Sequence, residues 1–135
     1  NDVKENLKNQ KVIYFELLGS GGFYSVNYEH FIKDRVSLRG GISYIYQTLI
    51  LPVSINKIKH IKGDSFFETS IGSSFVFYDD DNDDSDFIII TGIGFRGQPI
   101  GRGPFTRFTF NPSLKVTNGI NFGMTVGVSF GLSFK

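Results

Sequence analysis

The stretch NFGMTVGVSFGLSFK, residues 121–135, decides the fold. Every second position carries a large apolar side chain, and the positions between them carry Gly, Ser, Thr or Asn. This strict alternation predicts a β-strand with one apolar face. The opposite face has almost no side-chain volume. Such a strand needs an apolar environment on one side and a narrow, crowded space on the other.

The same period of two recurs along the chain from residue 11, and no helical stripe interrupts it. Residues 1–10 are polar and are expected to form a lead-in, and KIKHIKGD, residues 57–64, is expected to be a basic connection. The predicted strands cover residues 11–18, 23–32, 35–45, 49–57, 65–78, 87–96, 104–114 and 121–135. Short loops between eight strands predict an all-β fold, an eight-stranded antiparallel up-and-down β-barrel over residues 11–135.

Composition narrows the classes of protein that fit. The chain of 135 residues is expected to form one domain and has no Cys, which excludes disulfides and thiolate metal sites. Its net charge is +1, although six of its 13 acidic residues lie within residues 79–86. The Lys and Arg residues form neither a basic helix nor a patch interleaved with aromatics, so we expect no nucleic-acid partner. No apolar run approaches the roughly 18 residues of a membrane helix.

A soluble barrel and a membrane barrel share this alternation, with the two faces exchanged. Inward apolar faces would force too many large side chains into a lumen that is only just wide enough for side chains to fill. They would also leave a Gly-rich face in water, where Gly weakens a strand. Outward apolar faces remove both problems, and strands of about 9–11 residues suffice to cross a bilayer. The sequence therefore predicts a transmembrane β-barrel with a side-chain-filled lumen.

Long charged side chains then occupy inward positions among the small residues. Three acids and three bases have inward parity: Glu16, Glu29, Arg39, Glu68, Arg96 and Arg107. Equal numbers of opposite charges suit a buried network, because an unpaired buried charge is strongly destabilising. We interpret these residues as a structural lumen network rather than as catalytic or proton-conducting groups.

Six stretches of the chain carry a family resemblance: GGFYSVNYEH, LILPVSIN, SFFETSIGSSF, GIGFRGQP, PFTRFTFNPSL and VGVSFGLSFK. In this order they resemble the small outer-membrane β-barrel proteins common in Bacteroidetes, which are similar in architecture to the OmpA and OmpX barrels. The closing strand also resembles the aromatic-ended signal read by the barrel-assembly machinery, although Lys135 follows the aromatic Phe134 here. The resemblance implies the bacterial outer membrane as location, with membrane lipid and the assembly machinery as partners. It implies no enzymatic activity and no cofactor.

Residues 92–97 spell G-x-G-x-x-G after a predicted strand. A dinucleotide site needs a helix to open there, so that its amides can hold a pyrophosphate. Pro99, Pro104, Gly101 and Gly103 prevent such a helix. We therefore reject nucleotide binding.

The acidic loop has a partial resemblance to a calcium site. Asp79, Asp81 and Asp83 have alternating spacing, but Asp84 and Ile90 stand where an EF-hand has Gly and Glu. We interpret the segment as a solvated hairpin loop, with weak divalent-cation binding at the three Asp residues as the alternative.

The two histidines do not indicate a catalytic or metal site. Neither His30 nor His60 has Cys or a carboxylate at metal-ligand spacing. His30 shares the parity of Tyr28, which faces outward, whereas a Ser-His-Asp site would need His and Ser together. We expect no enzyme, no cofactor and no metal.

These observations favour a non-catalytic outer-membrane barrel with both ends of the chain in the periplasm. Its expected role is structural or accessory, including membership of a larger envelope complex. Two alternatives from other classes remain open: a soluble lipocalin-like barrel that binds an apolar ligand, and a lipid A-modifying barrel enzyme. A requirement for detergent distinguishes the membrane barrel from the soluble one.

Overall fold

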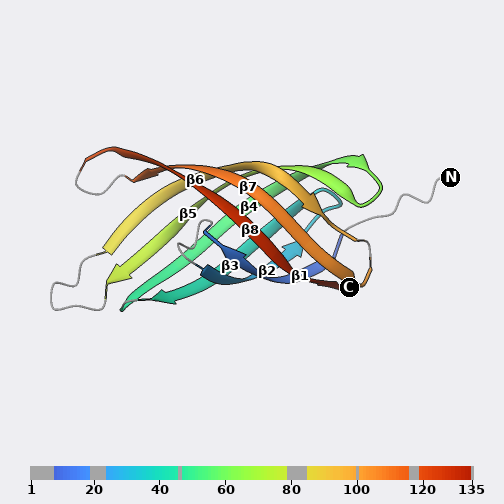
Figure 1. Ribbon diagram of the computed structural model, residues 1–135, viewed down its shortest axis with the longest axis horizontal. Coiled ribbons are helices and arrows are strands. Elements are labelled where there is room, and N and C mark those ends of the chain that lie inside the picture. Colours follow the sequence, from blue (N-terminus) through green and yellow to red (C-terminus); the bar gives the residue numbers. More distant parts are fainter. Residues whose placement is uncertain are drawn as a thin grey trace.

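A computed structural model describes residues 8–18, 24–45, 47–78, 85–99, 101–115 and 119–134. The proposed cation ligands Asp79, Asp81 and Asp83 lie outside these residues. The strands form one closed barrel, in which the first strand begins and the last strand ends at the same end (Figure 1). No helix in the described part of the chain could cross a membrane.

The barrel has eight strands that follow one another around the wall in chain order. Every neighbouring pair is antiparallel, including the pair of β1 and β8 that closes the barrel. The predicted eight-stranded antiparallel β-barrel is confirmed. The strands are β1 (Lys11–Leu17), β2 (Tyr24–Phe31), β3 (Val36–Ile45), β4 (Thr48–Lys62), β5 (Ser65–Tyr78), β6 (Ser85–Gly97), β7 (Gly103–Lys115) and β8 (Asn121–Phe134).

The register shows that the strands are strongly tilted. Directly opposed residues can be followed from Ile13 around the barrel through Tyr28, Gly40, Val53, Ser73, Ile89, Leu114 and Phe122. Ile13 also faces Leu132, so one circuit returns to β8 displaced by ten residues. Such a stagger requires the strands to lean by roughly 35–45° from the barrel axis.

The structure corrects the prediction that the basic segment at residues 57–64 is a connection between strands. This segment is not a connection, because β4 continues to Lys62 and only Gly63 and Asp64 form the turn. The ladder with β5 runs on from Lys57 opposite Thr69 to Lys62 opposite Ser65. Gly63 adopts a φ of 54°, which Gly accepts without strain and which allows this tight turn. Pairing with β5 thus overrides the weak strand signal of alternating Lys and Ile.

The apolar faces of the strands lie outside the barrel. Each strand exposes large apolar side chains, among them Ile13, Tyr28, Ile42, Val53, Phe75, Ile93, Phe108 and Phe130. The buried residues are mostly polar or charged, which reverses the pattern of a water-soluble protein. The side chains inside the barrel are therefore the place to look for a functional site.

Candidate functional site in the barrel lumen

The six charged residues with inward parity all lie in the lumen and are buried. They come from six strands: Glu16 from β1, Glu29 from β2, Arg39 from β3, Glu68 from β5, Arg96 from β6 and Arg107 from β7. Alternation along each strand places them, since each is flanked by outward-facing residues. The structure brings all six into one network of ion pairs.

Glu68 is shared between two arginines. Arg96 Nε donates to Glu68 Oε1 at 2.5 Å, and Arg107 Nε donates to Glu68 Oε2 at 2.8 Å. Each carboxylate oxygen thus accepts from a different guanidinium. Charge-assisted bonds of this kind are about twice as strong as neutral ones.

Glu16 connects Arg39 to Arg107 on the opposite side of the network. Arg39 donates to Glu16 Oε1 at 2.9 Å, and Arg107 donates to Glu16 Oε2 at 2.8 Å. Arg107 therefore bridges Glu16 and Glu68 across the lumen. The two acids lie on strands that are not neighbours, so the bridge ties together distant parts of the wall.

Glu29 completes the network through Arg96. The two terminal nitrogens of Arg96 donate to the two oxygens of Glu29 at 2.9 and 3.2 Å. The hydroxyl of Ser37 also donates to Glu29. The two groups form a bidentate pair, which fixes the orientation of the guanidinium as well as its position.

An apolar layer lies on the side of the network nearer the chain ends. It consists of Val12, Tyr14, Phe31, Ile58, Phe66 and Phe105. The Arg96 guanidinium carbon lies 5.7 Å from the Phe31 ring centre and 5.2 Å from that of Phe105. These distances permit cation–π attraction, so the aromatic rings cover one side of the charged network.

A polar layer closes the lumen beyond the apolar one. Gln10 and Gln98 each donate to the Ser133 hydroxyl, at 2.6 and 2.7 Å. Gln10 also donates to the Gly101 carbonyl at 2.5 Å. The polar lead-in predicted for residues 1–10 therefore contributes a buried side chain to the barrel mouth.

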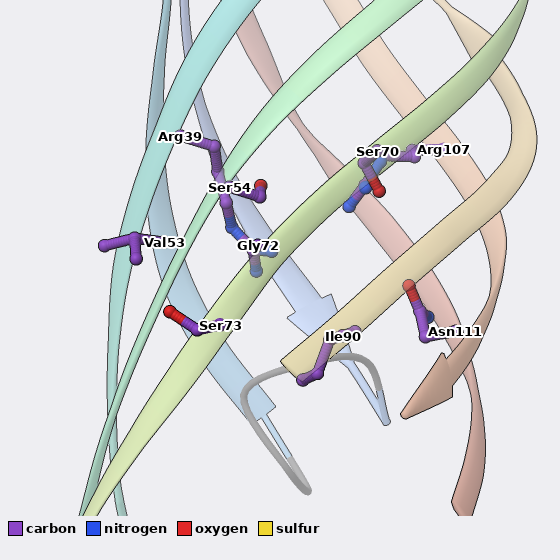
Figure 2. Close-up of a pocket in the computed structure, with 9 residues that line it drawn as sticks. All are labelled: Arg39, Val53, Ser54, Ser70, Gly72, Ser73, Ile90, Arg107 and Asn111. Atoms are coloured by element: carbon purple, nitrogen blue, oxygen red, sulfur yellow. The ribbon is translucent and has the colours of Figure 1, made fainter. Parts of the chain in front are cut away.

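The other side of the network faces a small cavity, which Figure 2 shows in close-up. Its volume is about 10 Å³, roughly the space of one water molecule. Small and polar residues dominate its lining, together with the two arginines of the network: Arg39, Val53, Ser54, Ser70, Gly72, Ser73, Ile90, Arg107 and Asn111. This cavity is too small for an organic ligand.

Glycines in the lumen allow the close packing of these layers. Gly131 lies directly between Tyr14 and Phe105, whose ring centres are 5.0 Å apart. A Cβ at Gly131 would overlap the Ile13 carbonyl oxygen. Gly94 lies between Glu68 and Thr109, where a Cβ would overlap the Phe108 carbonyl oxygen. Any larger side chain would displace the wall or its contents.

In the described part of the chain, neither the glycine motif at residues 92–97 nor the two histidines form a binding site. Residues 92–97 belong to β6, so no helix follows them that could hold a phosphate. His30 lies on the outer face of β2, and His60 lies near the end of β4 with its Nε2 2.8 Å from the Gly63 carbonyl oxygen. Among the described residues, no group of three His, Cys, Asp or Glu side chains could hold a metal ion.

The sequence reasoning missed the aromatic layer of the lumen. The signal was parity: Phe31 has the parity of Glu29, Phe66 that of Glu68, and Phe105 that of Arg107. These residues lie near strand ends. The prediction assigned the apolar residues of each strand to the outer face, so it did not place these apolar residues in the lumen.

Comparisons with known proteins support the fold. No protein-family model matches the chain, and no curated protein sequence matches it. The barrel is similar to the crystal structure of the N-terminal beta-barrel domain of Pseudomonas aeruginosa OprF. The TM-score is 0.67 at 13% sequence identity, and the match covers 94% of this chain and 98% of that one. At this identity the similarity establishes the architecture, a small OmpA-like eight-stranded barrel.

Proposed function

We propose that the chain is an integral outer-membrane β-barrel with a structural or accessory role and no catalytic activity. The proposal includes the periplasmic location of both chain ends and the relationship to small barrels of the Bacteroidetes type. Lipid would solvate the outer face, and the lumen would form a closed plug. Membership of a larger envelope complex is one form that the accessory role can take.

One observation carries this proposal: the apolar side chains face out and the charges face in. Closure of the sheet pairs the strands around the wall, which a bilayer requires because its core offers no hydrogen-bond partners. Water would solvate such an exterior poorly, since it exposes far more contiguous apolar surface than a soluble monomer carries. The similarity to the N-terminal β-barrel domain of OprF supports the closed-barrel architecture on which this proposal depends.

The soluble alternative fits this lumen poorly. A lipocalin-like barrel needs an apolar interior cavity for its ligand. Here the middle of the lumen contains three acids and three arginines in ion pairs, and an apolar layer fills the space next to them. A barrel enzyme also fits poorly, because the buried carboxylates Glu16, Glu29 and Glu68 are already bonded to arginines.

The lumen layers support a closed barrel rather than a pore. A test is conductance of the refolded protein in a planar bilayer. We expect insertion without stable ohmic channels, because the charged, aromatic and glutamine layers lie in series. Steady channels in the wild-type protein would contradict the closed plug. Recovery in the soluble fraction of cells without detergent would contradict the membrane location.

A further inference from the structure

Positive charge gathers at the end of the barrel where the chain ends lie. The described basic residues at this end are Lys8, Lys11, Lys33, Arg35, Lys57, Lys59, Lys62 and Arg102, whereas the acidic ones are Asp34 and Asp64. Among the described residues, the opposite end carries one basic residue, Lys115. The barrel is therefore electrically asymmetric along its axis although its net charge is only +1.

Lys57 and Lys59 continue the outward face of β4 beyond its apolar part. Ile55 on that face lies opposite Leu38 and Ile71, which are both exposed and apolar. The next outward residues are the two lysines, and both are exposed. Within the described part of the chain, neither ammonium group has an ion-pair partner. The lysines thus stand directly at the edge of the apolar band.

Apolar side chains surround the two lysines. Lys59 lies opposite Phe67, and the Phe67 ring packs against Phe95 with ring centres 5.8 Å apart. A bulge lies in β4 between His60 and Lys62, and it leaves Ile61 51% exposed. A bulge re-aims a side chain, and here it presents an isoleucine next to the lysines. Cations mixed with exposed apolar groups suit the headgroup region of a membrane, where both can be solvated.

We propose that Lys57 and Lys59, with Ile61 and Phe67, form a binding surface for the headgroups of anionic phospholipids. The occupant is a lipid of the leaflet nearer the chain ends. Its phosphate would pair with the ammonium groups, and its acyl chains would lie against Ile55 and Phe67. Charge complementarity selects this occupant, since the surface is cationic and has no paired acid among the described residues. The inference rests on the proposed membrane function.

The test uses fluorescence quenching by brominated lipids, which is possible because the chain has no Trp. A Phe67→Trp reporter lies beside Lys59, and a Phe122→Trp reporter lies on β8 near the opposite end, where Phe122 is exposed. Each variant is refolded into vesicles of phosphatidylcholine and phosphatidylglycerol, with one lipid brominated at a time. The ratio of the quenching by brominated phosphatidylglycerol to that by brominated phosphatidylcholine gives the preference of each site for the anionic lipid.

We expect the Phe67→Trp reporter to show a preference for phosphatidylglycerol that added salt weakens. Lys57→Gln and Lys59→Gln should each reduce it, on the order of fivefold per lysine. Lys115→Gln, which removes the same charge at the other end of the barrel, should leave it unchanged. The Phe122→Trp reporter should show little preference.

Two results would overturn the inference in distinguishable ways. Equal quenching by both lipids at the Phe67→Trp reporter, or a preference that survives loss of both lysines, would reject the binding surface while leaving the membrane barrel intact. Absence of quenching by either lipid at both reporters would show that the chain is not in the bilayer, and would reject the proposed function together with the inference.

Discussion

Arg96 reaches Glu68 diagonally across two neighbouring strands, because the residue directly opposite Glu68 is Gly94. The hydrogen bond from Arg96 Nε to Glu68 Oε1 is 2.5 Å long. A Cβ at Gly94 would overlap the β7 backbone at Phe108 and Thr109. Gly94 therefore allows β6 and β7 to approach closely at the position where Arg96 meets Glu68.

Breaking this pair should be strongly destabilising. Glu68→Ala leaves two arginines without a shared partner, and Arg96→Ala removes the guanidinium that donates to both Glu29 and Glu68. We expect each change to lower the free energy of unfolding by about 3–5 kcal/mol, with a double mutant less damaging than the sum. Urea unfolding of protein refolded in lipid measures both. Phe75→Leu on the outer face is the control, and additive small effects would show that the two residues are not coupled.

The close approach of strands at Gly94 gives a second prediction. Gly94→Ala places a Cβ against the β7 backbone and should destabilise the barrel by about 1–3 kcal/mol. Gly40 faces outward, and a Cβ added there would have no atom within 4 Å. Gly40→Ala should therefore be neutral or stabilising by up to about 1 kcal/mol. Equal effects in a urea titration would show that Gly94 is not sterically required.

Tyr14 carries a hydroxyl that is buried and has no hydrogen-bond partner among the described residues. Removing the hydroxyl should relieve a desolvation cost. The free energy of unfolding of Tyr14→Phe should therefore equal that of the wild type or exceed it by up to about 1 kcal/mol. Tyr14→Ala should instead cost about 3–5 kcal/mol, because it empties the space beside Phe105. Urea unfolding measures both changes, and a marked loss of stability in Tyr14→Phe would reveal a bonded hydroxyl.

A charged substitution on the outer face of the barrel tests the proposed membrane location. Val53 is 43% exposed on the outer face of β4, between the two ends of the apolar band. Val53→Arg should cost about 2–4 kcal/mol in a bilayer, whereas Thr106→Arg near the rim should cost at most about 1 kcal/mol. Unfolding in lipid vesicles gives both values. Indistinguishable effects at the two sites would argue that lipid does not surround Val53.

The faces of the strands could be predicted from the sequence because the period of two leaves little choice. A shift of one residue would exchange every apolar side chain with a small or charged one. The inward positions of Glu16, Glu68 and Arg107 follow from the same rule. Alternation thus determines which residues enter the lumen.

The partners of those residues could not be predicted. Arg107 on β7 reaches Glu16 on β1, and Arg96 on β6 reaches Glu29 on β2, so the pairs cross the lumen between strands that are not neighbours. Which side chains meet depends on the stagger of the whole barrel, and no local pattern encodes it. The prediction of where β4 ends was wrong for a related reason. Pairing with β5, and not the composition of residues 57–62, makes this segment a strand.

The pairing of β1 with β8 has a consequence for the order of folding. Lys11 lies opposite Phe134, so the contact that closes the wall joins the first strand of the barrel to its last strand. Every other neighbouring pair is a local hairpin, which can form early. Until β8 arrives, β1 presents an edge of unpaired amides that hydrocarbon cannot solvate. In the proposed membrane location, the strands therefore cannot enter a bilayer one after another, and closure and insertion must proceed together.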